Sequence, residues 1–262
     1  MFRYITDCKE LGCTQLDPWM RHMQGVRTAE EIKGTYKDPD SVGLSASDRA
    51  YVAKVRAASE KAGVPFGCIA ADEAHIYEET ADARTANRAW ACFWLLIAEE
   101  LGAPQIRVDA GGPPDLSDEV LGIIVEGYED VIARAKAKGI DVLMENHWGP
   151  ANDPGNVVRI LDAVPGLGLL FDTGNWRPGM QEKGWEECAP RAVASHIKTF
   201  AFDERGNERS ADVPKAIRLL VDAGYDGCWG IESCPEDGDE YGAARKTIEL
   251  IRRTLKDLGV EK

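Results

Sequence analysis

The chain has 262 residues, 44% of them hydrophobic and 29% charged, and its formal net charge at pH 7 is −14. No apolar run approaches the roughly 20 residues of a membrane span, which argues against a transmembrane helix. So acidic a surface also disfavours nucleic acid as a partner, because nucleic-acid binding relies on Lys and Arg to neutralise phosphates.

The cysteines indicate the redox environment. The chain has seven, none of them in a CxxC pair, and residues 1–12 mix acidic and basic side chains without the apolar core of a signal peptide. We therefore predict reduced thiols in a cytoplasmic protein.

Short apolar runs alternate with amphipathic segments along the whole chain. Helical patterns that end near Gly separate these runs, which is a common way for helices to stop. Such alternation predicts an α/β fold with parallel strands buried on both faces, formed as a single TIM (β/α)8-type barrel domain over residues 1–262. The apolar runs cover residues 14–17, 65–70, 105–110, 140–145, 168–173, 193–198 and 228–232.

Two parts of the chain depart from a regular barrel pattern. The chain opens directly in a helical pattern over residues 2–12, so the first strand is expected to be absent or atypical. The longest irregular stretch covers residues 18–45, which predicts either a lid or binding loop or a loosely ordered surface loop. In that stretch, Trp19 and Met20 are candidates for capping a small polar ligand.

Four successive apolar runs end in Glu145, Asp172, His196 and Glu232. In α/β barrels the carboxyl ends of the strands face the active site. Three carboxylates and one imidazole form an oxygen-rich donor set that suits Mn²⁺, Mg²⁺, Co²⁺ or Zn²⁺. Any one of these residues has a structural alternative as a helix cap or ion-pair partner. The four together favour one divalent metal site.

Further polar side chains near these strand ends are candidates for substrate binding. His147 lies two residues after Glu145, where it could contact a substrate hydroxyl or orient a neighbour. Lys198 shares a strand face with His196 and could stabilise an oxyanion, or form an ion pair with Asp172.

Arg107 and two tryptophans complete the substrate-binding candidates. Arg107 could bind substrate or form an interior salt bridge. Trp148 and Trp176 could stack on sugar rings or pack in the core. Asp72 and His75, which follow the run 65–70, are weaker candidates for a functional role.

Five motifs resemble the sugar phosphate isomerase/epimerase family, also called the xylose isomerase-like TIM barrels, whose relatives include ketose 3-epimerases and inosose dehydratases. The motifs are LGAPQIRV, GIDVLMENHWG, LGLLFDTGN, SHIKTF and GYDGCWGIES, and the resemblance covers nearly the whole chain. It implies that Glu145, Asp172, His196 and Glu232 bind one divalent metal.

The ketose 3-epimerase branch implies a second role for two of these ligands. Its two metal-bound glutamates act as paired acid and base on opposite faces of the substrate, which makes Glu145 and Glu232 the catalytic residues here. Several relatives have a His where this chain has Asn175, which departs from the ketose 3-epimerase pattern. We place Asn175 among the substrate-binding residues.

The resemblance implies a metal-dependent sugar or polyol isomerase or epimerase that abstracts a proton next to a carbonyl through an enediolate. Mn²⁺ is the first choice of metal, with Mg²⁺, Co²⁺ or Zn²⁺ as alternatives. The expected partner is a small sugar or polyol, and neither nucleic acid nor membrane is expected. The expected assembly is a homodimer or a homotetramer.

Other functions remain open at this stage. An inosose-type dehydratase or a C-glycoside-cleaving lyase would use the same residues. A non-catalytic sugar-binding barrel is another alternative. An abasic-site endonuclease-like DNA repair enzyme is more distant, because that type needs a three-zinc cluster rich in His and this chain has four His.

Overall fold

The computed structural model describes residues 1–260. Their contacts form two compact units. Unit 1 comprises Met1–Glu145 and Ile160–Leu167, and unit 2 comprises Asn146–Arg159 and the described residues from Gly168 onward.

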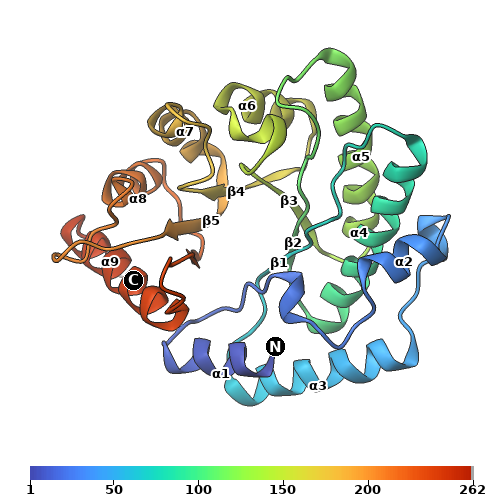
Figure 1. Cartoon of the computed structure of the whole chain (residues 1–262), viewed down its shortest axis with the longest axis horizontal. Helices are drawn as coiled ribbons and strands as arrows, with labels where there is room; N and C mark the ends of the chain where they lie inside the picture. The colour runs from blue at the N-terminus through green and yellow to red at the C-terminus, as the bar shows by residue number, and fades with distance from the viewer. Residues whose placement is uncertain (261–262) are drawn as a thin grey trace. The chain divides into compact units, whose positions relative to one another are not determined.

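Unit 1 contains three parallel strands in sequence order, with Ile69 opposite Ile106 and Ile106 opposite Val142. Helix α4 packs against β2 and helix α5 against β3 (Figure 1). The elements are α1 (Phe2–Glu10), η1 (Met20–His22), α2 (Ala29–Thr35), η2 (Pro39–Ser41), α3 (Ala46–Ala62), β1 (Cys68–Ala70), α4 (Ala81–Leu101), β2 (Gln105–Arg107), α5 (Asp118–Lys136) and β3 (Asp141–Glu145).

The apolar run 14–17 was predicted to be a strand, but among the described residues the first strand is β1; the segment that precedes η1 runs beside β1 through isolated bridges. Leu16 pairs with Phe66 and Trp19 with Ala70 in isolated parallel bridges. A side chain on Gly67 would prevent this close approach, because its Cβ would lie 2.4 Å from Asp17 Oδ1.

The prediction that residues 18–45 are irregular was wrong, since this stretch contains η1, α2 and η2. Thr28 and Glu31 form a capping box that starts α2. The guanidinium of Arg27 donates to Asp48, to the Tyr36 hydroxyl and to a backbone carbonyl. Local caps and one arginine therefore order a stretch that has little apolar periodicity.

Unit 2 also contains three parallel strands in sequence order. Asp172 lies opposite His196, and Lys198 lies opposite Glu232. Helix α8 packs against α9, and α9 packs against β6 (Figure 1). The remaining elements of the chain are η3 (Gly149–Asn152), α6 (Pro154–Ala163), β4 (Gly168–Asp172), α7 (Gln181–Cys188), η4 (Ala189–Arg191), β5 (Ala192–Thr199), α8 (Val213–Asp222), β6 (Trp229–Ser233) and α9 (Glu240–Asp257).

Each unit has large buried side chains in its core. In unit 1, Phe93 and Trp94 of α4 are almost fully buried, as are Phe171 and Trp185 in unit 2.

Within residues 1–260 no strand precedes helix α1, in agreement with the expectation for the start of the chain. None of the described helices is long and apolar enough to cross a membrane.

Candidate metal centre

Three of the four predicted metal ligands lie together in unit 2. Asp172 ends β4, His196 lies on β5 and Glu232 lies on β6. The strand register brings them to the same level, and one ligand atom of each lies within 4.8 Å of those of the other two. Parallel neighbours in register thus produce the convergence that the sequence predicts for these three residues.

The turn after β4 fixes the carboxylate of Asp172. Its Oδ1 accepts the backbone N–H groups of Gly174 at 2.6 Å and Asn175 at 2.8 Å. The Asn146 side chain donates to the Asp172 carbonyl at 2.9 Å and accepts from the Asp172 N–H at 2.8 Å. Asp172 is fully buried. It is therefore held at both its side chain and its peptide groups.

Asn146 is not among the site residues predicted from the sequence. This residue is fully buried, and both ends of its amide are used on Asp172. Its position directly after Glu145 at a strand end was the available signal. The partner of such an amide depends on the neighbouring strand, and no pattern within one strand reveals it.

His196 and Glu232 face each other across β5 and β6. His196 Nδ1 lies 3.3 Å from Glu232 Oε2. Gly230 permits this approach, because a Cβ there would lie 2.1 Å from the Ser195 carbonyl oxygen and 3.1 Å from His196 Cδ2. Any larger residue at position 230 would have to displace β5 or the imidazole.

Lys198 is the cation of this cluster. Its Nζ donates to Glu232 Oε1 at 2.6 Å and to Asn175 Oδ1 at 2.9 Å, and lies 4.0 Å from Asp172 Oδ2. The ion pair considered for Lys198 is therefore present, chiefly with Glu232 rather than Asp172. Gly174 makes room for the lysine stem, since its Cβ would lie 2.9 Å from Lys198 Cδ.

These neighbours decide the charge of Glu232. Burial alone would raise its pKa, but the hydrogen bond and charge of His196 and the charge of Lys198 outweigh burial. The pKa of Glu232 therefore lies far below its ordinary value, and the carboxylate is ionised at neutral pH.

The donor chemistry of this cluster fits a divalent ion. Asp172 and Glu232 offer carboxylate oxygens and His196 offers an imidazole nitrogen, all within 4.8 Å of one another. Such mixed oxygen and nitrogen sets suit Mn²⁺, Mg²⁺, Co²⁺ and Zn²⁺.

Glu145, the fourth predicted ligand, ends β3 in unit 1 and is buried. Its Oε2 lies 3.0 Å from Arg107 Nε. Arg107 Nη1 donates to Asp72 Oδ1 at 2.6 Å and to Asp109 Oδ2 at 2.9 Å. The interior salt bridge considered for Arg107 is therefore present, with three carboxylates, and a substrate contact by Arg107 stays a prediction.

The charge state of Arg107 follows from this arrangement. Burial lowers the pKa of Arg107, but the charges of Asp109, Glu145 and Asp72 outweigh burial and raise that pKa well above its ordinary value. Arg107 is thus a permanent cation at the carboxyl end of the unit 1 strands.

The two candidate tryptophans differ in environment. Trp176 is buried, and its ring centroid lies 6.1 Å from that of Phe171. Gly184 is packed under it, since a Cβ there would lie 2.4 Å from the Trp176 ring. Trp148 is exposed and His147 half-buried, so both are accessible. The substrate contacts assigned to all three stay predictions.

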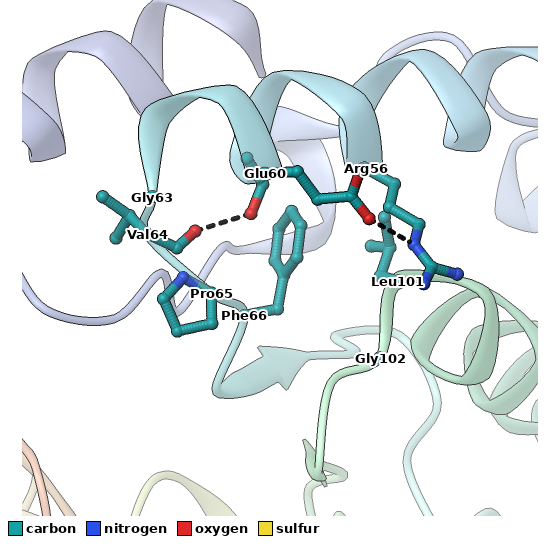
Figure 2. Close-up of a pocket in the computed structure, with 9 residues that line it drawn as sticks. Arg56, Glu60, Gly63, Val64, Pro65, Phe66, Leu101 and Gly102 are labelled. Carbon is teal, nitrogen blue, oxygen red and sulfur yellow. Dashed lines mark hydrogen bonds and ion pairs between the residues drawn. The ribbon is translucent and has the colours of Figure 1, made fainter.

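A cavity of about 280 Å³ lies at the amino end of β1 in unit 1 (Figure 2). Residues at the ends of α3 and α4 line it, including Leu101 and the ion pair between Arg56 and Glu60 at 3.0 Å. Its lining includes no His, Asp or Cys. It offers no catalytic group comparable with those at the strand ends.

The family model described as the xylose isomerase-like TIM barrel matches residues 5–254 of the chain. The protein belongs to this family. The membership confirms the resemblance seen in the sequence motifs and the α/β TIM-barrel class.

Two curated relatives match parts of the chain. The C-glycoside deglycosidase alpha subunit of Microbacterium trichothecenolyticum is 32% identical over 109 residues, which cover 36% of this chain and 29% of the relative. The subunit of the same name from Arthrobacter globiformis is 29% identical over 79 residues, covering 28% of this chain and 22% of the relative. The match spans less than a third of each relative.

Solved structures share the fold at low sequence identity. A xylose isomerase-like TIM barrel protein from Mycobacterium smegmatis in complex with magnesium has a TM-score of 0.71 at 17% identity, covering 99% of this chain and 89% of that one. The 3-keto-D-glucoside 4-epimerase of E. coli has a TM-score of 0.68 at 16% identity, covering 96% and 92%. A D-psicose 3-epimerase solved in the presence of D-fructose has a TM-score of 0.62 at 16% identity, covering 98% and 91%.

Proposed function

We propose that this protein is a divalent-metal-dependent isomerase or epimerase of sugars or polyols, which abstracts a proton next to a carbonyl. The observation that carries the proposal is the cluster of Asp172, His196 and Glu232, in which Lys198 donates a hydrogen bond to Glu232. Family membership and the fold shared with two sugar epimerases support the reaction class.

Glu145 is proposed as the fourth ligand. It is a buried carboxylate at the end of β3. Its peptide bond joins it to Asn146, whose side chain holds both peptide groups of Asp172. In the proposed set Glu145 brings the donors to three carboxylates and one imidazole. Mn²⁺ is the proposed metal, with Mg²⁺, Co²⁺ or Zn²⁺ as alternatives.

A divalent ion held there would polarise the substrate carbonyl and stabilise the enediolate. Glu232 is ionised and can take a proton from the carbon next to the carbonyl. Glu145 is proposed as the second carboxyl group; in its protonated form it would give a proton to the opposite face or to the neighbouring carbon, and proton exchange with solvent would then return both carboxyl groups to their starting states. Lys198, whose Nζ lies within this cluster, is proposed as the N–H donor for a developing oxyanion. His147, Asn175 and Trp148 are proposed to contact the substrate.

The decisive experiment is a panel of ketoses and inososes incubated with the protein in D₂O and followed by NMR. Deuterium at a carbon next to the carbonyl is expected, and Glu145→Gln or Glu232→Gln should each abolish it. Glu236→Gln, an exposed neighbour on the loop after β6, is the matched control and should leave exchange unchanged. Full exchange in either site variant would refute the two-carboxylate assignment.

A second candidate is a lyase, favoured by the names of the two curated relatives, which are C-glycoside deglycosidase subunits. Elimination of a β-substituent would start from the same proton abstraction. The D₂O panel separates the two, because a lyase or dehydratase releases a product that lacks the leaving group, whereas an epimerase returns an isomer.

The proposal also treats residues 1–262 as one TIM-barrel domain. A single family model spans residues 5–254, which supports this organisation. Limited proteolysis that yields one resistant core would agree with it, and two independently stable fragments would contradict it.

A further inference from the structure

Asp72, which follows β1, has a carboxylate fixed by several donors. Its Oδ1 accepts from Arg107 Nη1 at 2.6 Å, and its Oδ2 accepts from the indole N–H of Trp19. The indole N–H of Trp90 donates to the Asp72 backbone carbonyl at 2.8 Å. Both the side chain and the backbone of Asp72 are therefore held in place.

This carboxylate is held without being covered. An ionised carboxylate offers about four acceptor positions. The donors from Arg107 and Trp19 use one on each oxygen, and the side chain of Asp72 is 24% exposed. Acceptor capacity therefore remains on a rigid, charged and accessible group, where a hydroxyl donor would form a charge-assisted hydrogen bond.

An exposed aromatic ring adjoins this acceptor. Trp19 is 40% exposed, and its backbone pairs with Ala70 at the end of β1. The guanidinium carbon of Arg21 lies 5.0 Å from the Trp19 ring centroid, and its Nη2 lies 3.8 Å from Glu73 Oε1. The surface thus combines an apolar ring, a fixed carboxylate and an exposed N–H donor.

The backbone beneath this surface is also unusual. Glu73 has φ 64°, the one positive φ of a non-glycine residue in the described chain. The ammonium of Lys33 holds the Glu73 carbonyl at 2.5 Å. Tertiary contacts therefore maintain a turn conformation that L residues rarely adopt, and such positions concentrate at functional sites.

A purely structural role explains these features incompletely. If the bond from Trp19 to Asp72 only attached the segment before η1 to β1, burying the ring would stabilise the contact further. Instead, the indole N–H donates to Asp72 while a large part of Trp19 is exposed to solvent. A sugar or polyol has the matching chemistry, with a C–H face for the ring and hydroxyls for the carboxylate.

We propose that Trp19 and Asp72 form a hydroxyl-binding subsite that selects polyhydroxylated substrates, with a hydroxyl donating to Asp72 and a C–H face on the indole. The class of substrate that this subsite selects rests on the function proposed above. Arg107 contacts both Asp72 and Glu145, so the subsite adjoins the carboxyl group that is proposed to move protons. The substrate therefore has hydroxyl groups beyond those next to the reacting carbon.

The test is a binding experiment that needs no turnover, with D-fructose, D-psicose and myo-inositol as probes. The indole N–H signal of Trp19, assigned by its absence from Trp19→Phe, is expected to shift on titration of wild-type protein with at least one probe. Asp72→Asn and Trp19→Ala should each weaken that binding by about tenfold, the loss of one charge-assisted contact. Trp19→Phe keeps a ring and should weaken it less than Trp19→Ala.

Tyr241→Ala is the matched control, because this exposed aromatic residue lies on α9 in unit 2. It should bind the probes as the wild type does. The proposal is overturned if no probe shifts the Trp19 signal, or if folded Asp72→Asn and Trp19→Ala bind as tightly as the wild type. The shift is read on wild-type protein, so it remains decisive if a variant fails to fold.

The two proposals fail in distinguishable ways. Probe binding at Trp19 without any deuterium exchange would retain the subsite and remove the isomerase or epimerase assignment. Exchange that is indifferent to Asp72→Asn and Trp19→Ala, in both KM and kcat, would retain the reaction and remove the subsite.

Discussion

The strand ends of the two units collect carboxylates in two different ways. In unit 1, one guanidinium contacts Asp72, Asp109 and Glu145. In unit 2, the ammonium of Lys198 lies near both Asp172 and Glu232, and the imidazole of His196 faces Glu232. A guanidinium presents several fixed N–H donors and stays charged, whereas an ammonium is a single point charge. The cation of the first cluster therefore makes several directed contacts, whereas the donor atoms of the second cluster would fit a divalent ion.

The largest expected effect tests the first half of this comparison. Arg107→Met leaves the buried carboxylates of Asp109 and Glu145, and the partly exposed carboxylate of Asp72, without their cation, and should lower the free energy of unfolding by about 3–5 kcal/mol. Urea denaturation measures the loss. Added Mn²⁺ should not restore it fully, because a single ion cannot reproduce three directed contacts. Arg107→Lys should recover part of the stability, and a variant as stable as the wild type would contradict the role of Arg107.

The second prediction concerns the metal ligands of unit 2. Asp172→Asn removes a charged donor and should weaken Mn²⁺ binding by about 100-fold or more, as measured by isothermal titration. Asp203→Asn, an exposed carboxylate in the loop after β5, is the control and should bind Mn²⁺ normally. Equal affinity in Asp172→Asn and wild-type protein would remove Asp172 from the proposed site.

The third prediction, Lys198→Met, tests whether a metal can replace the charge of the ammonium in the unit 2 cluster. Without metal it leaves Glu232 short of its cation and should cost about 1–2 kcal/mol of stability, the scale of a hydrogen bond to a charged group. Saturating Mn²⁺ should abolish this difference, because a metal would supply the missing charge. Thermal unfolding with and without Mn²⁺ measures both states. A loss that Mn²⁺ leaves unchanged would show that Lys198 only supports the fold.

The smallest effect provides a reference outside both clusters. The half-buried Arg27 forms an ion pair with the buried Asp48, and Asp48 also accepts from the Ser45 hydroxyl. Burial raises the pKa of Asp48, but hydrogen bonds from Ser45 and Arg27 outweigh burial and lower it. Its contribution to stability is therefore present above the unfolded pKa of about 3.9 and lost as pH falls through the lower folded value.

Asp48→Asn should accordingly be less stable than the wild type at pH 7, and the gap should narrow as pH falls from about 5 to 3. Urea midpoints over this range measure it. A gap that stays constant or widens at low pH would mean that the charge of Asp48 does not stabilise the fold.

The convergence of the three proposed metal ligands of unit 2 could be predicted from the sequence because the relevant information is local. Asp172, His196 and Glu232 each follow or interrupt an apolar strand, and parallel register aligns them. The partners of Lys198 and Asn146 were less accessible, since they depend on side-chain directions across neighbouring strands. The ordered stretch from 18 to 45 was missed because caps and the contacts of Arg27, rather than periodicity, define it.

Asp72 illustrates the same limit from the other direction. In the sequence it is one acidic residue among several after β1, with no pattern that distinguishes it. Only the tertiary fold brings Trp19, Trp90 and Arg107 to it, from three separate segments. Its place after a strand made Asp72 a candidate for a functional role. Its fixed and accessible carboxylate could not be predicted from the sequence.

The missing side chain of Gly230 has a practical consequence for protein engineering. The distance between His196 and Glu232 is set by how closely β5 and β6 approach, and that approach depends on one absent carbon atom. Exchanging the loops after these strands should therefore leave the spacing of the donors unchanged. Position 230 itself should be kept invariant in any such library.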